Sequence, residues 1–163
     1  MIDVGQIIGI LANVGVLAGI VFLAVELRQN TVAVRSEASQ GVQGQITDIY
    51  SLLTTDRVAD VYRRGTANPD QLDPTETVIF NSLLSQMLAG FENVFALVNE
   101  GSYDESRARG YWQLLRDMLE YPGFRRHWER RRFIYSEAFR EHVENDVLKL
   151  ERVDRSTVLS ATN

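Results

Sequence analysis

Hydrophobic and polar positions divide the chain into an apolar N-terminal stretch and a longer amphipathic remainder. Positions 7 to 25, IIGILANVGVLAGIVFLAV, hold no charged residue, and Asn13 is their only strongly polar side chain. At ~1.5 Å rise per residue, a helix over these positions is roughly 28 Å long, close to the ~30 Å hydrocarbon thickness of a bilayer. The pattern therefore predicts a single membrane-spanning helix, with residues 1–28 as a transmembrane anchor.

Two other interpretations of the apolar stretch stay open. A cleaved signal peptide has a basic start and a small-residue cleavage site, whereas this chain begins with Asp3 and no Lys or Arg, and Glu26 to Asn30 follow the apolar run. A buried helix of a soluble bundle usually keeps a polar face, which this stretch lacks. We therefore expect an anchor that is retained.

Small residues gather on one side of the predicted span. The positions within roughly 120° of one helical face, at ~100° per residue, are Gly5, Gly9, Ala12, Gly15 and Gly19, with Asn13 just beside them. Small side chains let two helices approach closely in lipid. We expect these residues to form a helix-packing interface with other membrane-protein subunits or with a second copy of the chain.

The basic residues near the span predict its orientation. Arg28 and Arg35 follow the span, and no Lys or Arg precedes it. Because Lys and Arg flanking a span are retained on the cytoplasmic side, we expect a short outer N-terminus and a cytoplasmic domain.

The rest of the chain keeps helical periodicity, which predicts a small bundle over residues 29–150 and a polar tail over residues 151–163. Residues 29 to about 54 continue the span as one long helix, with Gly41 and Gly44 as the place for a bend. The later helices are expected over 56–64 (ending at Gly65) and over 124–133. Capping patterns predict three further starts: Asp73-Pro74-Thr75-Glu76 for a helix to about Glu100, Ser102-Tyr103-Asp104-Glu105 for one that closes at Tyr121, and Ser136 for the last helix. Short connections favour an all-α, up-and-down bundle, and its expected core aromatics are Phe80, Phe91, Phe95, Trp112 and Phe139.

Composition narrows the function classes. The chain has 163 residues, 45% of them hydrophobic, and its net charge is −5, which argues against a nucleic-acid binder. It contains no cysteine, which excludes disulfides, thiolate nucleophiles, thiolate zinc sites and cysteine-ligated iron–sulfur clusters.

No motif points to catalysis. The phosphate-binding patterns GxGxxG and GxxxxGK[ST] are absent, and neither His127 nor His142 has the Glu three residues earlier that a di-iron bundle requires. Glu92 lies in the predicted central helix, where we expect it to pair with Arg109 or Arg116. We therefore expect no catalytic residue, no cofactor and no metal.

The segment from Phe124 to Phe133, FRRHWERRRF, is the most basic part of the chain. Basic residues near anionic head groups each contribute ~1 kcal/mol, and the same charges suit an acidic partner surface. On a helical wheel the five Arg point nearly all round, so some are expected to pair with acids of the bundle. The candidates for lipid or partner contact are Arg125, Arg126, Trp128, Arg130, Arg131 and Arg132.

Several blocks of the chain are similar to a family of small single-span membrane proteins common in marine proteobacteria. The blocks are Phe22-Leu-Ala-Val-Glu-Leu-Arg-Gln-Asn-Thr31, Phe91-Glu-Asn93, Asn99-Glu-Gly101, Pro122-Gly123, Trp128-Glu129-Arg130 and Ser136-Glu-Ala-Phe-Arg140. In that family an N-terminal span runs directly into an Arg-Gln-Asn-Thr sequence and a helical domain. The resemblance implies this architecture and a bacterial inner-membrane location. It implies no catalytic residue, and Glu26 stands where a neutral residue is expected.

The predicted function is non-catalytic: a single-span accessory or scaffolding subunit of a larger inner-membrane complex. The alternative is a membrane-tethered, homo-oligomeric sensor or effector whose helical domain binds a ligand or a soluble partner. A third hypothesis is a membrane enzyme that uses Glu92 and an arginine.

Overall fold

The computed structural model describes residues 3–151, so most of the predicted polar tail lies outside the described residues. Within this range the chain forms α-helices and short 3-10 turns and contains no strand, which confirms the all-α prediction. The helices are α1 (Val4–Leu53), α2 (Asp56–Ala67), α3 (Pro74–Asn99), α4 (Glu105–Leu119), α5 (Pro122–Arg131) and α6 (Glu137–Asn145). The 3-10 turns are η1 (Pro69–Gln71), η2 (Arg132–Ile134) and η3 (Val147–Lys149).

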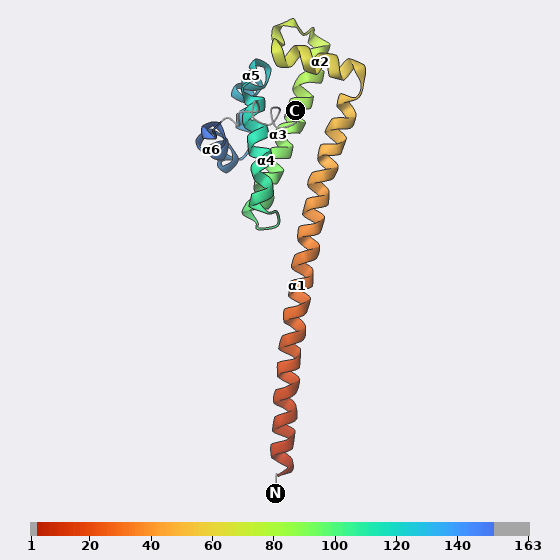
Figure 1. The fold of residues 1–163 in the computed structure, drawn as a ribbon, viewed down its shortest axis with the longest axis vertical. Coiled ribbons are helices and arrows are strands. Elements are labelled where there is room, and N and C mark those ends of the chain that lie inside the picture. Colours follow the sequence, from red (N-terminus) through yellow and green to blue (C-terminus); the bar gives the residue numbers. More distant parts are fainter. Residues whose placement is uncertain (1–2, 152–163) are drawn as a thin grey trace, which may run out of the picture.

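Helix α1 is one uninterrupted helix that extends far beyond the bundle (Figure 1). Its 50 residues correspond to ~75 Å at ~1.5 Å per residue. The helix continues through Gly41 and Gly44, where the sequence suggested a bend. Only its C-terminal part packs on the bundle, against α3 and α2, and Val42 is its buried contact residue.

Three polar residues cap the starts of helices, and two of them, Asp73 and Ser136, are caps that the sequence predicts. Asp73 accepts a hydrogen bond from the Glu76 backbone N–H at 2.8 Å, and Glu76 accepts one from the Asp73 N–H at 3.0 Å, which completes a capping box. Asp104 caps α4, and Ser136 caps α6 through the Phe139 N–H. These contacts satisfy backbone donors that the first helical turn leaves without a partner.

Two predicted boundaries are wrong. Helix α2 continues through Gly65 to Ala67, and α5 begins at Pro122, two residues before the predicted start. Gly65 is buried within α2, and the Phe80 ring lies so close that a Cβ at this position would stand 2.7 Å from it. This glycine therefore permits close helix packing and does not end the helix.

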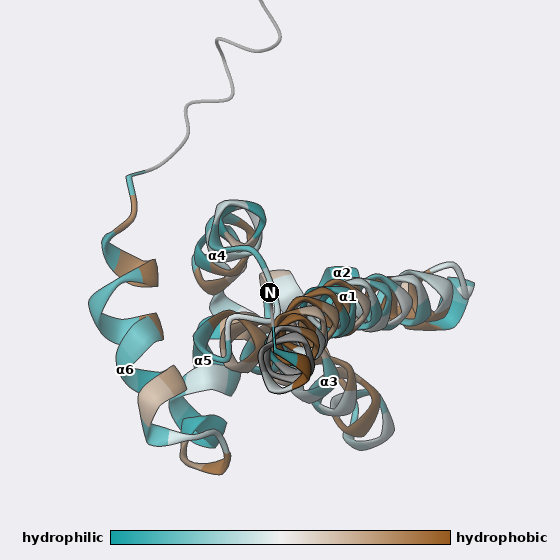
Figure 2. Ribbon diagram, turned by 90° about the horizontal axis from the view of Figure 1, so that it is seen from below, coloured by the Kyte–Doolittle hydropathy of each residue, from teal (hydrophilic) through white to brown (hydrophobic). Residues whose placement is uncertain are grey.

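The core lies where α3 meets α2, α4 and α5, and α6 covers one side of it. Four of the five predicted core aromatics, Phe80, Phe91, Trp112 and Phe139, are buried, and Phe95 is half-buried. Viewed from the N-terminal end, α1 runs obliquely across the view over α2; α4 and α5 lie on its other side, and α6 lies farthest out (Figure 2). Helices α2 to α6 thus form a small bundle, from which α1 projects.

Candidate functional site

The projecting half of α1 is the largest unusual feature of the molecule. Every described side chain from Asn13 to Glu37 is exposed, including Phe22 with 66% of its surface accessible. A stretch of α1 is long and apolar enough to cross a membrane, and none of it is buried inside the protein. A signal sequence near the N-terminus shares these properties, whereas the core helix of a soluble domain would be mostly buried. Within residues 3–151, no other element covers the side chains of α1 from Asn13 to Glu37.

The residues predicted to form a helix-packing interface all lie in this half of α1. Gly5, Asn13, Gly15 and Gly19 are exposed, and a Cβ on Gly15 or Gly19 would meet no heavy atom within 4 Å. The surroundings of Gly9 and Ala12 lie outside what the structure describes. The glycine face is thus open at Gly15 and Gly19, and its packing against another helix stays a prediction.

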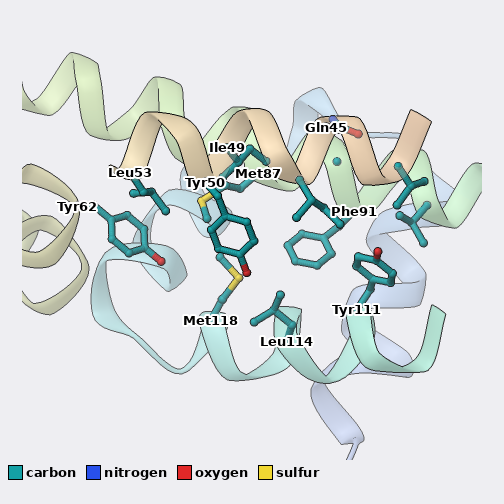
Figure 3. Close-up of a pocket in the computed structure, with 14 residues that line it drawn as sticks. Gln45, Ile49, Tyr50, Leu53, Tyr62, Met87, Phe91, Tyr111, Leu114 and Met118 are labelled. Atoms are coloured by element: carbon teal, nitrogen blue, oxygen red, sulfur yellow. The ribbon is translucent and has the colours of Figure 1, made fainter. Parts of the chain in front are cut away.

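An apolar cavity of about 390 Å³ lies where the C-terminal part of α1 meets the bundle (Figure 3). Sequence periodicity did not identify it, because it forms from helices far apart in the chain. Its labelled side chains converge from α1 (Gln45, Ile49, Tyr50, Leu53), α2 (Tyr62), α3 (Met87, Phe91) and α4 (Tyr111, Leu114, Met118). The tyrosine hydroxyls and the Gln45 amide are the polar groups in an otherwise hydrophobic lining.

Two tyrosines of this cavity, Tyr62 and Tyr111, stay protonated near neutral pH. Burial and a hydrogen bond with Tyr103 raise the pKa of Tyr111 to about 12, and burial raises the pKa of Tyr62. Neutral phenols supply hydrogen-bond donors without charge. The cavity therefore suits an uncharged or amphipathic molecule, as is typical of small-molecule sites.

A polar cluster joins α3 to α5. The His127 Nδ1 lies 2.9 Å from the Asn81 Oδ1, and the His127 Nε2 lies 3.2 Å from the Ser85 Oγ. Because an amide oxygen only accepts, the ring proton lies on Nδ1 and Nε2 accepts from the serine hydroxyl. Burial, with a contribution from Arg131, lowers the pKa of His127 to about 4, so the ring is neutral near pH 7.

The hydrogen-bonded chain Ser85–His127–Asn81 resembles a nucleophile, its general base and a group that orients the base. Ser85 nevertheless lies in the middle of α3, where backbone N–H groups are bonded within the helix and are not available to an oxyanion. A histidine with a pKa near 4 is also a weak base at neutral pH. The cluster therefore holds the two helices together and does not form a hydrolytic site.

Glu92 has a different partner from the predicted ones. Its Oε1 accepts a hydrogen bond from the Ser136 backbone N–H at 2.7 Å, whereas Arg116 pairs with Asp117 at 3.3 Å and with Glu120 at 3.2 Å. The expected pairing with Arg109 or Arg116 is therefore wrong. Glu92 satisfies the backbone at the start of α6, which connects α6 to the central helix.

Among residues 3–151, no group of three or more His, Asp or Glu side chains is placed to hold a metal ion. The His142 Nδ1–H donates to the Asp146 Oδ2 at 3.0 Å, and the His142 ring stacks on Phe95 at a centroid distance of 5.0 Å. These contacts describe a histidine packed at the edge of the core.

The predicted basic segment divides into buried, paired and exposed residues. Trp128 is only 5% exposed and stacks on Tyr135, so its predicted place at a lipid or partner surface is wrong. Arg126 forms a bidentate pair with Asp70 at 2.5 and 2.9 Å. Arg132 pairs with Glu144, and the Arg125 Nε donates to the Leu119 carbonyl at 3.3 Å. The side chains of Arg130 and Arg131 are exposed.

The fold defines the molecule as an all-α bundle with one long, apolar projecting helix. Comparisons with protein-family models, curated proteins and solved structures find no match to this chain.

Proposed function

We propose that the protein is a single-span, non-catalytic accessory or scaffolding subunit of a larger complex in the bacterial inner membrane. The observation that carries the proposal is the two-part character of α1 (Val4–Leu53). Its described side chains from Asn13 to Glu37 are exposed, while its C-terminal part is packed into the bundle.

The hydrophobic effect supplies the driving force for anchoring. Val16, Phe22 and Leu23 each leave more than half of their surface accessible. Transferring a side chain of this type out of water is favourable by ~1.5–3 kcal/mol, and a span contains many of them. Within lipid the helix also satisfies its own backbone groups, which a membrane-spanning segment must do. Because α1 is one unbroken helix, the anchored part is joined to the bundle without a flexible linker.

In this arrangement the bundle stands above the membrane on a short stalk. The loop before α4 lies against α1 near Arg35 and Ser39. Arg35 is ten residues beyond the last residue of the predicted span, or ~15 Å along the helix axis. Helix α5 lies against α2, toward the opposite end of the bundle (Figure 1). Its basic residues are therefore better placed to meet a partner than the lipid of the same membrane.

The open glycine face supports a second membrane helix as the partner. Gly15 and Gly19 have free space where a Cβ would stand, and small residues favour close packing of helices in lipid. Arg28 and Arg35 favour a cytoplasmic bundle in this proposal.

The proposal is tested by purifying the native-level protein in mild detergent and identifying co-purified proteins by mass spectrometry. The double variant Gly15→Leu/Gly19→Leu is expected to stay in the membrane and to lose the partner subunit. The matched control, Val21→Leu/Ala24→Leu, adds bulk to the opposite face of α1 and is expected to keep it. Recovery of the unmodified chain in the soluble fraction would disprove the anchor, and recovery from the membrane without a stoichiometric partner would disprove the subunit role.

A second candidate is a membrane-tethered, homo-oligomeric sensor or effector whose bundle binds a ligand or a soluble partner. The apolar cavity of about 390 Å³ favours it, because Ile49, Tyr50 and Leu53 of α1 form one wall. A molecule in this cavity would contact the helix that runs toward the membrane. Purification distinguishes the candidates: a defined hetero-complex supports the subunit, and a pure homo-oligomer supports the sensor.

A further inference from the structure

Three arginines of the basic segment share one face of α5 with the buried His127. Arg126 and Arg130 are four residues apart, as are His127 and Arg131, so the four side chains form two neighbouring rows along α5. Together with η1 and α3 they line a cavity of about 430 Å³. The helical wheel predicts that the five arginines of the segment point nearly all round the helix, but in the structure these three line the same cavity.

The charge inside this cavity opposes that of the whole molecule. Three guanidinium groups meet one carboxylate, Asp70, which is already paired with Arg126. His127 contributes no charge near neutral pH. The lining therefore keeps an excess of two positive charges: among residues 3–151 neither Arg130 nor Arg131 has a close ion-pair partner, and Arg130 acts on Asp70 only at longer range, as a secondary cause of the lowered pKa of that carboxyl. The chain as a whole carries a net charge of −5.

The other lining residues divide into donors and an apolar wall. Thr77 and Asn81 come from the face of α3 opposite the arginines, and the Asn81 amide, whose oxygen is bonded to His127, has its nitrogen as the donor group. Leu72 and Phe80 add a hydrophobic wall. The cavity thus combines hydrogen-bond donors from α3 and α5 with a hydrophobic wall that can contact the apolar part of a ligand.

We propose that this cavity binds the phosphate group of a small soluble phosphomonoester, with Arg130 and Arg131 as its main ligands. A phosphate carries ≈ −1.5 to −2 charges at pH 7, which matches the two unpaired guanidinium groups. Guanidinium groups bind phosphate oxygens bidentately, and donors on two sides suit a tetrahedral group better than a planar carboxylate. The wall of Leu72 and Phe80 then contacts the organic part. This inference does not depend on the membrane role proposed above.

Calorimetric titration of the full-length chain in detergent with phenyl phosphate tests the site. We expect saturable binding, stronger than that of benzoate and stronger at pH 8 than at pH 5, because the second phosphate ionisation lies near pH 6. Arg130→Gln and Arg131→Gln should each weaken binding about tenfold or more, the loss expected for a hydrogen bond to a charged group. Circular dichroism should show that these exposed substitutions leave the fold intact.

Arg109→Gln is the matched control, since Arg109 is an exposed arginine on α4 outside the cavity. It should leave the affinity for phenyl phosphate within about twofold, as expected for a residue outside the site. An equal loss in this variant, or no binding to the unmodified chain, would overturn the proposal.

Competition with phosphatidic acid in mixed micelles tests whether the bound phosphate belongs to a soluble molecule or to a lipid head group. Competition by this lipid, absent with phosphatidylcholine, would overturn the soluble source in favour of a lipid head group.

Discussion

Gly123 of α5 lies directly against the backbone of Gly65 in α2: a Cβ on Gly123 would stand 2.1 Å from the Gly65 carbonyl oxygen. The same Cβ would lie 2.9 Å from the ring of Phe80. Two helices can approach this closely only where neither has a side chain at the crossing. This contact holds α2 against α5, and it fixes the position of the arginines that follow Gly123 on the same face.

Substituting Gly123 by alanine is therefore expected to destabilise the bundle. The added methyl group must displace backbone and ring atoms, which typically costs ~1–3 kcal/mol and more where the backbone cannot move. The matched control is Gly110→Ala in α4, because a Cβ there meets nothing within 4 Å. The control should raise stability by up to ~1 kcal/mol through helix propensity. Urea unfolding of both variants, followed by circular dichroism, measures the difference, and equal midpoints would contradict the close contact.

Acid should weaken the polar contacts that His127 of α5 makes with Asn81 and Ser85 of α3. Burial lowers the folded pKa of His127 to about 4, below the 6.5 of an unperturbed histidine, so folding favours the neutral ring. This contribution is complete above about pH 6.5 and is lost as the pH falls toward 4; it amounts to about 3 kcal/mol. The free energy of unfolding of the unmodified chain should fall more steeply over this range than that of His127→Gln. Parallel pH curves would show that His127 is not buried as a neutral ring, since carboxylates act equally in both proteins.

Glu92 should act as a hydrogen-bond acceptor at the start of α6 and not as a catalytic carboxylate. Glu92→Ala leaves the Ser136 N–H without its partner and should destabilise the chain by ~1–2 kcal/mol, with faster amide exchange in α6. Glu92→Gln keeps an oxygen acceptor and should lie close to the unmodified protein. A glutamine variant as unstable as the alanine variant would indicate that the charge is essential.

The local parts of the fold follow from the sequence because their causes are local. Asp73 and Glu76 form a capping box within one turn, and Ser136 caps α6 through an N–H three residues away. The periodicity of α3 likewise predicts Phe80 and Phe91 as core residues, because one face of a long helix must be buried.

The errors arise where the role of a residue depends on another helix. Gly65 resembles a helix terminator until the ring of Phe80 occupies the space beside it. Trp128 lies among arginines in sequence, yet its ring stacks on Tyr135 in the core. Both cavities also combine residues from elements far apart in the chain, so no sequence window contains either lining. Sequence patterns therefore predicted the helices but not the surfaces on which a ligand would bind.

The anchor itself gives a prediction that separates a membrane span from an exposed soluble helix. Leu17→Arg places a charge near the middle of the predicted span, where insertion costs ~2.5–3.5 kcal/mol. The matched control, Val34→Arg, introduces the same charge at an exposed position of α1 beyond the span. Alkaline carbonate extraction of membranes should retain the unmodified chain and the control, while Leu17→Arg shifts into the soluble fraction. If all three proteins behave alike in the soluble fraction, lipid does not cover this helix, and its apolar surface must bind another protein.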